Sequence, residues 1–277
     1  MPAKQDISAE IANGLPVASN PRTLRELRKQ AQRQSGEAKY SMRLARTADE
    51  RAQAFRLRFL VFNIELREGL ESAFATGYDT DQFDDVCDHL IVEHHSTGRV
   101  IATYRMQTGA NAAAKIGYYS EQEFDFSPFE SIRSALVEVG RAAILKEHRT
   151  FEVLNLLWKG IANYATEHRG RYLVGCSSLT SQDPAEGIEL YRQLEPFLAA
   201  PELRSKPQSG FGLPKDVEPL SPGAIAAPKL LRAYLNLGAR ICGEPALDRE
   251  FKTIDFLTLL DLETLSPVAR ARFFDAP

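Results

Sequence analysis

Apolar residues recur along the chain with two different periods, and the changes between them predict where helices and strands lie. Helical spacing runs from residue 48 to 62 and again over 151–168, the segment FEVLNLLWKGIANYATEH. Between these helices, residues 89–95 (HLIVEHH) and 99–106 (RVIATYRM) predict two strands, which the turn at 96–98 (STG) would join as a hairpin.

Further apolar runs complete the predicted architecture. Strands are expected at 40–46 (YSMRLAR), 135–144 (ALVEVGRAAI), 171–179 (RYLVGCSSL) and 252–262 (KTIDFLTLLDL), and a helix at 229–238 (KLLRAYLNLG). Polar and turn-forming residues predict loops at 69–85 and 201–228. Because strands and helices alternate in this order, we expect an α/β (α+β) fold with a mixed central sheet flanked by helices.

The start of the chain differs from the rest. Residues 1–39 are polar and rich in turn formers, so we expect a flexible N-terminal segment there and one domain over 40–277. Within the segment, residues 22–33 (RTLRELRKQAQR) are basic, and Thr23 and Glu26 have the spacing of a helix capping box. Two interpretations stay open, a solvated helix face or a patch that attracts anionic lipid or an acidic carrier protein.

Composition narrows the functional class. The 277 residues include 34 basic and 37 acidic side chains, a net charge of -3, which argues against nucleic acid as a partner. Three singly spaced cysteines form no C-x-x-C pair, so we expect no metal and free thiols in a reducing compartment. The start of the chain lacks the pattern of a signal peptide, and no apolar run is long enough to span a bilayer. We therefore expect a cytoplasmic protein, with peripheral contact to the inner membrane left open.

Four short motifs contain the residues most suited to catalysis or substrate binding. They are 58–62 (RFLVF), 81–84 (DQFD) followed by 88–92 (DHLIV), 104–106 (YRM) and 138–141 (EVGR).

Together these motifs resemble those of the acyl-homoserine lactone synthases, GNAT-fold enzymes that use acyl-carrier-protein thioesters. That family has Arg and Phe on its first helix, a D-x-x-D loop, an Arg on a strand and E-x-x-R on the next strand. The positions that match are Arg58, Phe62, Asp81, Asp84, Arg105, Glu138 and Arg141. There are two departures: Glu68 stands about where the family has an aromatic residue, and this chain continues well beyond a typical synthase.

A closer resemblance, from residue 40 to the end, is to the hemolysin-like ornithine Nα-acyltransferases. It rests on 136–164 (LVEVGRAAILKEHRTFEVLNLLWKGIANY), 175–179 (GCSSL) and 230–262 (LLRAYLNLGARICGEPALDREFKTIDFLTLLDL). The resemblance implies a GNAT-like acyltransferase domain with a C-terminal extension. It also implies transfer of a 3-hydroxyacyl chain from acyl carrier protein to ornithine, giving lyso-ornithine lipid.

Glu138 and Arg141 are the catalytic candidates. Amide formation from a thioester needs a free amine, and an α-amino group is only partly deprotonated near neutral pH, so a nearby acceptor helps. Glu138 could accept that proton, or it could instead form a salt bridge with Arg141. Since residues 138 and 141 point to opposite faces of a regular strand, the salt bridge would need a bulge, which Gly140 would permit.

The remaining motif residues are candidates for substrate binding. Arginine forks hold carboxylates bidentately, so the arginines could organise the acids into a network that shapes the amine pocket or one that only stabilises the fold. The substrate-binding set is Arg58, Phe62, Asp81, Asp84, Asp88 and Arg105. His89 is expected to be a hydrogen-bonded structural residue, and Cys176 a small buried apolar one.

The turn that would bind the donor's phosphates differs from that of acetyl-coenzyme A users. It corresponds to 149–154 (RTFEVL), which has no glycine, and Glu152 would repel phosphate. Free coenzyme A is thus disfavoured, and a carrier protein bearing phosphopantetheine is favoured, with no separate cofactor. Lys146, His148 and Arg149 are the candidates to meet the phosphate of that arm.

Two rival functions remain at this point. One is a lactone synthase or another N-acyl amino acid synthase, which would change the acceptor. The other is a non-catalytic binding module that keeps the GNAT fold.

Overall fold

The computed structural model describes residues 38–214, 216–218 and 220–274, and one mixed sheet forms its centre. Contacts group the chain from Tyr40 onward into one compact unit. The strands of the sheet are β1 (Tyr40–Leu44), β2 (Asp88–His94), β3 (Arg99–Thr108), β4 (Leu136–Ile144), β5 (Tyr172–Leu179), β6 (Arg240–Ile241), β7 (Ala246–Asp248) and β8 (Thr253–Asp261).

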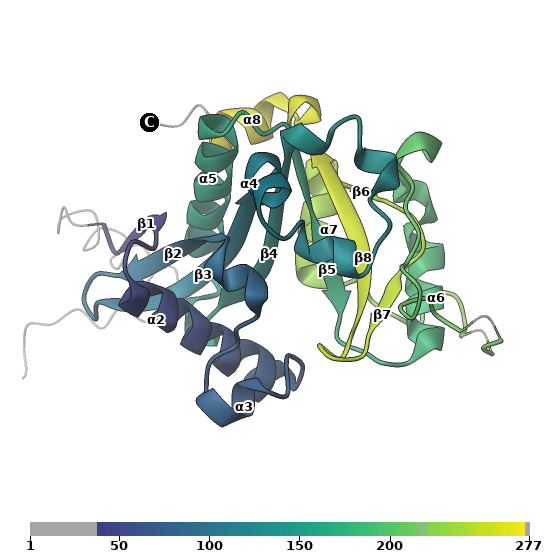
Figure 1. Ribbon diagram of the computed structural model, residues 1–277, viewed down its shortest axis with the longest axis horizontal. Helices are drawn as coiled ribbons and strands as arrows, with labels where there is room; N and C mark the ends of the chain where they lie inside the picture. The colour runs from purple at the N-terminus through teal and green to yellow at the C-terminus, as the bar shows by residue number, and fades with distance from the viewer. Residues whose placement is uncertain (1–37, 215, 219, 275–277) are drawn as a thin grey trace, which may run out of the picture. The chain divides into compact units, whose positions relative to one another are not determined.

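The strand order divides the sheet into two halves that meet in the middle. The order is β1-β2-β3-β4-β5-β8-β6, and β7 also pairs with β8. Only β4 and β5 run parallel, and every other pair is antiparallel. The β1–β4 half comes from the first part of the chain, and the β5–β8 half from the last (Figure 1).

Two long helices start where the sequence supplies hydroxyl caps. The Thr47 side chain accepts from the N–H of Glu50, whose carboxylate accepts from the N–H of Thr47, so a capping box starts the first helix. At the start of the second helix the Thr150 hydroxyl accepts from the N–H of Val153, without a reciprocal bond. The helices are α2 (Ala48–Phe59), α3 (Ala73–Thr76), α4 (Gly109–Ala114), α5 (Phe151–Glu167), α6 (Pro184–Leu194), α7 (Lys229–Leu237) and α8 (Pro267–Phe273).

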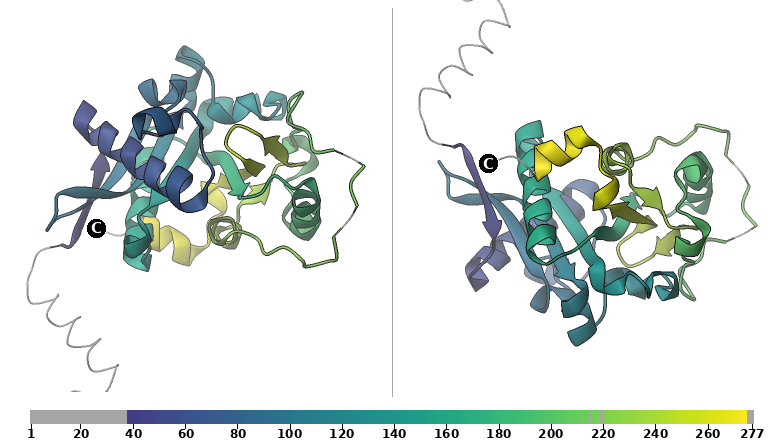
Figure 2. Two further views of the ribbon diagram at one scale, coloured as in Figure 1. Left: turned by 90° about the horizontal axis from the view of Figure 1, so that it is seen from below. Right: turned by 90° about the horizontal axis from the view of Figure 1, so that it is seen from above.

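Helices α2 and α5 cover opposite faces of the first half of the sheet. The ring of His89 on β2 meets Phe55 of α2, with 5.1 Å between centroids. The next residue, Leu90, lies so close to α5 that a Cβ at Gly160 would meet its Cδ2 at 2.6 Å. Neighbouring strand residues point to opposite faces, so the two helices sandwich the strands. Figure 2 shows α2 in front from below, and α5 with α8 in front from above.

The second half of the sheet is covered in the same two-sided manner. On one face, Leu190 of α6 and Leu231 of α7 pack with Phe256 of β8. On the other face, the next residue, Leu257, packs with Phe124 and other aromatic residues of the segment between β3 and β4. The two faces of β5 and β8 are therefore both buried, which explains why these strands read as continuous apolar runs.

The structure confirms the predicted mixed sheet flanked by helices and the succession of its main strands along the chain. Four helices, α3, α4, α6 and α8, were not predicted. The short strands β6 and β7 were not predicted either, because strands of two or three residues give no period. The predicted basic helix at 22–33 lies outside the described residues. Among the described helices, none combines the length and the apolar character needed to cross a membrane.

Candidate active site

The two halves of the sheet separate along the β4–β5 junction. Their parallel pairing covers only Leu136–Glu138 against Tyr172–Val174. At the next position, a Cβ on Gly175 would lie 2.1 Å from the Val139 carbonyl oxygen, so this last close approach needs glycine. Beyond it the strands diverge, and a cavity of about 750 Å³ opens between them, a size typical of small-molecule sites.

A bulge in β4 shapes one wall of this cavity. Arg105 of β3 pairs with Gly140 and Thr103 pairs with Ala143, so two residues of β4 stand opposite one residue of β3. Arg141 adopts the left-handed conformation there, with φ of 50°. A bulge of the kind that Gly140 would permit is present, although the residue in the left-handed conformation is the arginine and not the neighbouring glycine.

The cavity has a polar side and an apolar side. On the apolar side, Trp158 of α5 packs edge-on against Tyr234 of α7, whose hydroxyl hydrogen-bonds that of Tyr104 on β3. These residues are joined by others from α5, α7 and the strands, namely Leu154, Leu173, Leu231, Ala239 and Leu260. The polar side holds Glu68, Arg105, Tyr119, Glu138, Arg141, Cys176, Ser178, Thr180 and Asp255.

Arg58 is the centre of a buried ion-pair network beside the cavity. Its side chain is 1% exposed, and its Nε donates to Asp79 Oδ1 at 2.7 Å. Its Nη1 and Nη2 donate to the two carboxylate oxygens of Asp84 at 2.7 and 2.8 Å, the bidentate geometry expected for arginine. Asp79 is a member of the network that the sequence analysis missed.

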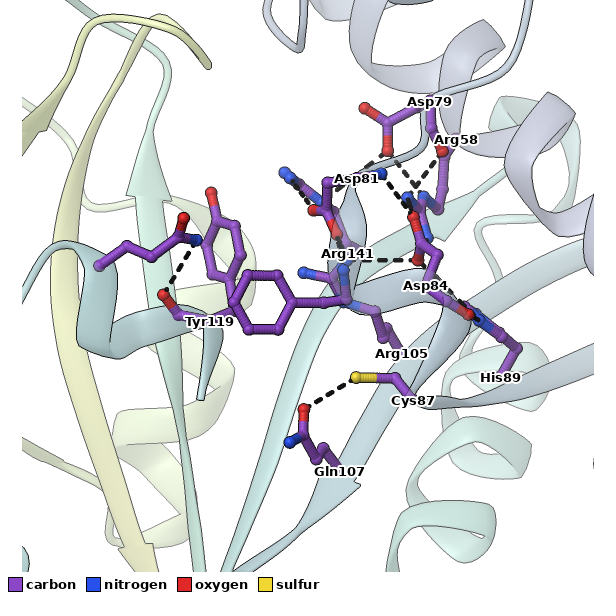
Figure 3. Close-up of polar contacts among 12 residues, drawn as sticks. Arg58, Asp79, Asp81, Asp84, Cys87, His89, Arg105, Gln107, Tyr119 and Arg141 are labelled. Atoms are coloured by element: carbon purple, nitrogen blue, oxygen red, sulfur yellow. Dashed lines mark hydrogen bonds and ion pairs between the residues drawn. The ribbon is translucent and has the colours of Figure 1, made fainter. Parts of the chain in front are cut away.

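Two further arginines link this network to the cavity wall (Figure 3). Arg105 donates to Asp81 Oδ1 at 2.6 Å, and Arg141 donates to Asp81 Oδ2 at 2.8 Å. Burial alone would raise the pKa of Asp81, but the two arginines lower it well below its usual range, so the carboxylate is charged. The ring of Tyr119 lies 5.0 and 4.8 Å from the guanidinium carbons of Arg105 and Arg141.

The D-x-x-D spacing has a local structural cause. Asp81 Oδ1 accepts from the N–H of Phe83, and Asp84 Oδ2 accepts from the N–H of Asp81, so the two acids form a capping box at a 3₁₀ turn. The same oxygens face the arginines. One motif therefore fixes the backbone and presents two carboxylates in a set geometry.

Glu138 does not form the predicted salt bridge with Arg141. Its Oε2 accepts from the N–H of Tyr119, and its Oε1 accepts from the N–H and hydroxyl of Ser120, all at 2.7 to 2.8 Å. Burial raises the pKa of Glu138, although these hydrogen bonds offset part of the effect. The bulge turns Arg141 toward Asp81 instead, so the salt-bridge interpretation is wrong.

Asp88 lies apart from the other predicted binding residues. It is exposed and accepts from the Tyr164 hydroxyl of α5 at 2.8 Å, on the opposite face of β2 from the network. Its placement in the network is therefore wrong. His89 is buried, its Nε2 lies 3.1 Å from the Asp84 carbonyl oxygen, and burial lowers its pKa, which fits the predicted structural role.

The three candidates for the phosphate of the donor arm occupy different environments. Arg149 lines the cavity, and its guanidinium holds Glu65 with two hydrogen bonds of 2.7 Å. Lys146 and His148 are not among the described residues that line the cavity. His148 Nδ1 instead lies 3.0 Å from the Tyr40 hydroxyl. Contact between these residues and a phosphate stays a prediction.

An acidic wall on the second half of the sheet was not predicted. Glu68 accepts from the Thr180 hydroxyl at 2.7 Å, and burial raises its pKa to about 7. Burial also raises the pKa of Asp255 to about 6, and that of Glu123 well above its usual range. Asp255 interrupts the apolar strand β8, and Glu68 is the departure from the lactone-synthase pattern, so both left a signal in the sequence.

Part of this wall could hold a metal ion. Among the described residues, Glu123, Cys176 and Asp255 present ligand atoms within 4.8 Å of one another. Each group would have to bind the ion without its proton. Burial raises the pKa of all three, which favours the protonated forms.

Comparisons with known proteins agree with the architecture. The family model of the acetyltransferase (GNAT) domain matches residues 57–159. The chain is 31% identical over 238 residues to an L-ornithine Nα-acyltransferase of Agrobacterium fabrum, covering 81% of each protein. A protein of the same name from Rhodobacter capsulatus is also 31% identical over 238 residues, covering 82% of this chain and 92% of the relative. The solved structure of the AHL synthase LasI aligns with a TM-score of 0.50 at 11% identity, covering 87% of this chain and 97% of that one, which supports the fold alone.

Proposed function

Because this chain belongs to the L-ornithine Nα-acyltransferase family, we propose that it transfers an acyl chain from acyl carrier protein to the α-amine of ornithine. It is an acyltransferase with a GNAT-type fold. The observation that carries the proposal is the two-sided cavity at the β4–β5 split, with apolar residues from α5 and α7 on one side and charged residues on the other.

The apolar side suits a long acyl chain. Its lining residues are aliphatic or aromatic, and the Tyr104 and Tyr234 hydroxyls satisfy each other, so the wall exposes little unpaired polarity. The cavity extends to Arg149, Thr150 and Phe151 at the start of α5. A thioester held between the two sides would place its carbonyl at the split, with the acyl chain toward α5 and α7.

The charged side suits an amino acid. Arg141 is bound to Asp81 through Nη2, its Nε lies 3.8 Å from Asp79 Oδ1, and the residue lines the cavity. The guanidinium of Arg141 could receive the α-carboxylate of the acceptor. The α-amine would then lie near Glu138, on the same strand and on the cavity wall.

The proposed reaction is a direct transfer. The neutral amine attacks the thioester carbonyl carbon, a C–N bond forms, and the C–S bond breaks. The amine proton passes to Glu138, directly or through a water, and then from Glu138 to the departing sulfur, which gives the thiol of the carrier arm and restores the carboxylate. One oxygen lone pair of Glu138 Oε2 remains open for this purpose, since that oxygen accepts one hydrogen bond, from Tyr119.

Acyl transfer by the purified protein tests this proposal. The protein is incubated with 3-hydroxyacyl carrier protein or the matching acyl-coenzyme A, and with ornithine, other amino acids or S-adenosylmethionine. We expect N-acylornithine and a preference for the carrier-bound donor. A lactone from S-adenosylmethionine would favour the synthase alternative, and no product from any pair would leave a non-catalytic binding module.

A further inference from the structure

The acidic wall is built from the end of β5, the strand β8 and the segment that follows α2. A π-helix, Leu60–Leu66, continues α2, and Arg67 then turns left-handed with φ of 59°, which directs Glu68 into the cavity. On the second half of the sheet, Asp255 pairs across the strands with Ser178. Thr180, two residues beyond Ser178, donates to Glu68, so one face carries both acids.

This wall has buried carboxyl groups without a cationic partner, which points to a cationic ligand. Asp255 is 3% exposed and lines the cavity, yet no N–H or hydroxyl of the described residues donates to its Oδ1. Behind it, Glu123 is 2% exposed, and its raised pKa favours a carboxyl that shares its proton with Asp255. The pair therefore has one proton between two buried acids and no arginine or lysine bound to it, and a buried charge without a counter-charge is costly.

The charges of the wall are not balanced by the nearby arginines. Arg141 is the cation whose charge acts on Glu68 and Glu123, and it already pairs with Asp81. Thr253 donates to Asp255 Oδ2 at 3.2 Å, a neutral hydrogen bond that leaves the charge uncompensated. A ligand that brings a positive charge to this side of the cavity would supply both the missing charge and the missing donors.

We propose that Glu68 and Asp255 form a subsite that binds the side-chain ammonium of a diamino-acid acceptor, and so select ornithine over neutral amino acids of equal length. This inference rests on the proposed function. An acceptor with its α-carboxylate at Arg141 would extend its side chain from β4 toward β5 and β8, where both acids lie. An ammonium group has three N–H donors, and the carboxylate oxygens of Glu68 and Asp255 can accept from them.

The test compares ornithine with norvaline, which has the same carbon chain and α-amine but no ammonium. Rates are measured for the wild type, Glu68→Gln and Asp255→Asn, with Glu71→Gln as the control, since Glu71 is exposed and pairs with Lys252 on the surface. We expect each of the first two variants to lower kcat/KM for ornithine about 10- to 100-fold, as for loss of a charge-assisted hydrogen bond. The rate with norvaline and the KM for the acyl donor should stay within about threefold, which also shows that the variants fold.

The pH dependence gives a second readout in the unaltered protein. As pH falls from 8 to 6, Glu68 (pKa about 7) takes up a proton, so the preference for ornithine over norvaline should shrink. The α-amine is common to both acceptors and cancels in the ratio. The titratable groups that face the two acids are Asp79, Glu123, Arg141, Cys176 and Asp248.

The outcomes separate the subsite from the proposed function. If the wild type acylates ornithine and norvaline equally well, or if the variants keep the wild-type preference, the subsite is wrong while N-acyl transfer stands. If no amino acid is acylated, the proposed function fails. Calorimetric binding of ornithine and norvaline then decides the subsite, and equal affinity for both would overturn it.

Discussion

Two buried clusters of charge flank the same cavity, and they differ in how the charge is balanced. In the network around Arg58, three arginines meet three aspartates at 2.6 to 3.8 Å, and the pKa of Asp81 is held well below its usual range. In the acidic wall, Glu68, Glu123 and Asp255 meet one another and neutral hydroxyls, and burial raises all three pKa values.

The difference indicates that the network around Arg58 supports the fold, whereas the acidic wall binds a ligand. In the network each aspartate is ion-paired with at least one arginine, so its charges are balanced without a ligand, and it fixes the position of the β4 bulge. In the wall the acids are bound only by hydroxyls and by one another, so a charge there stays uncompensated until a cation binds. Strong burial of charge is common to both clusters, and the balance of partners is what distinguishes them.

Glu138 lines the cavity that both clusters flank, and its replacement should lower the acylation rate more than any other change described below. We expect Glu138→Gln to lower kcat by about 10²- to 10⁴-fold, the usual range for loss of a proton acceptor. The control is Ser120→Ala, which removes one hydrogen bond to the carboxylate but keeps the acid. Steady-state rates with saturating donor and acceptor measure both. If both variants lowered kcat equally, the role of Glu138 would be to hold the Tyr119–Gln122 turn and not to accept a proton.

Breaking the balanced network should unfold the protein more readily. Arg58→Leu leaves Asp79 and Asp84 buried without their main cation, which costs about 3–5 kcal/mol when one partner of a buried ion pair is removed. Chemical denaturation measures the change in the free energy of unfolding. A loss below about 1 kcal/mol, the value for surface pairs, would show that solvent reaches the network.

Neutralising the unbalanced wall should stabilise the protein. The folded-state pKa of Glu68, about 7, lies above its ordinary value of 4.5, so the folded protein keeps a proton that the unfolded chain loses between these pH values. Its stability therefore falls as pH rises through this window. Without ligand, Glu68→Gln should raise the free energy of unfolding at pH 8 by about 1–3 kcal/mol, and by much less at pH 5. Denaturation at the two pH values measures this, and a loss of stability at pH 8 would contradict the unbalanced charge.

The smallest effect is expected at an exposed pair. Lys252 and Glu71 meet at 3.0 Å with side chains 43% and 79% exposed, so water competes for both charges. Glu71→Gln should change the free energy of unfolding by less than about 1 kcal/mol at any pH between 5 and 8. If Glu71→Gln changed the free energy of unfolding with pH as much as Glu68→Gln, burial would not explain the pH-dependent stability expected for the acidic wall.

Much of the balanced network could be predicted from the sequence, because its residues lie in short motifs. The D-x-x-D spacing forms a capping box whose geometry is local, and Arg58 lies on a helix that a second capping box starts. Two assignments failed for a different reason. The bulge in β4 turns the Arg141 side chain to the opposite face from the one expected. Asp88 points to the other face of β2, and which face that is depends on how the strand is placed in the sheet.

The acidic wall could not be predicted in the same way. Its three acids come from the end of a π-helix, a loop and the strand β8, and only the folded sheet brings them together. Each acid alone looks like an ordinary surface residue or a departure from a pattern. The sequence records the anomaly at Glu68 and the polar interruption at Asp255, but not that they face the same cavity.

The position of the acyl group on the product tests the central claim most directly. Ornithine carries two amines, and the proposed site holds the side-chain ammonium at the acidic wall while the α-amine meets the thioester. The protein is incubated with 3-hydroxyacyl carrier protein and ornithine labelled with ¹⁵N at the α-position, and fragment masses locate the amide. We expect a single acyl chain on the labelled nitrogen. Acylation of the side-chain nitrogen, or no acylation of ornithine, would contradict it.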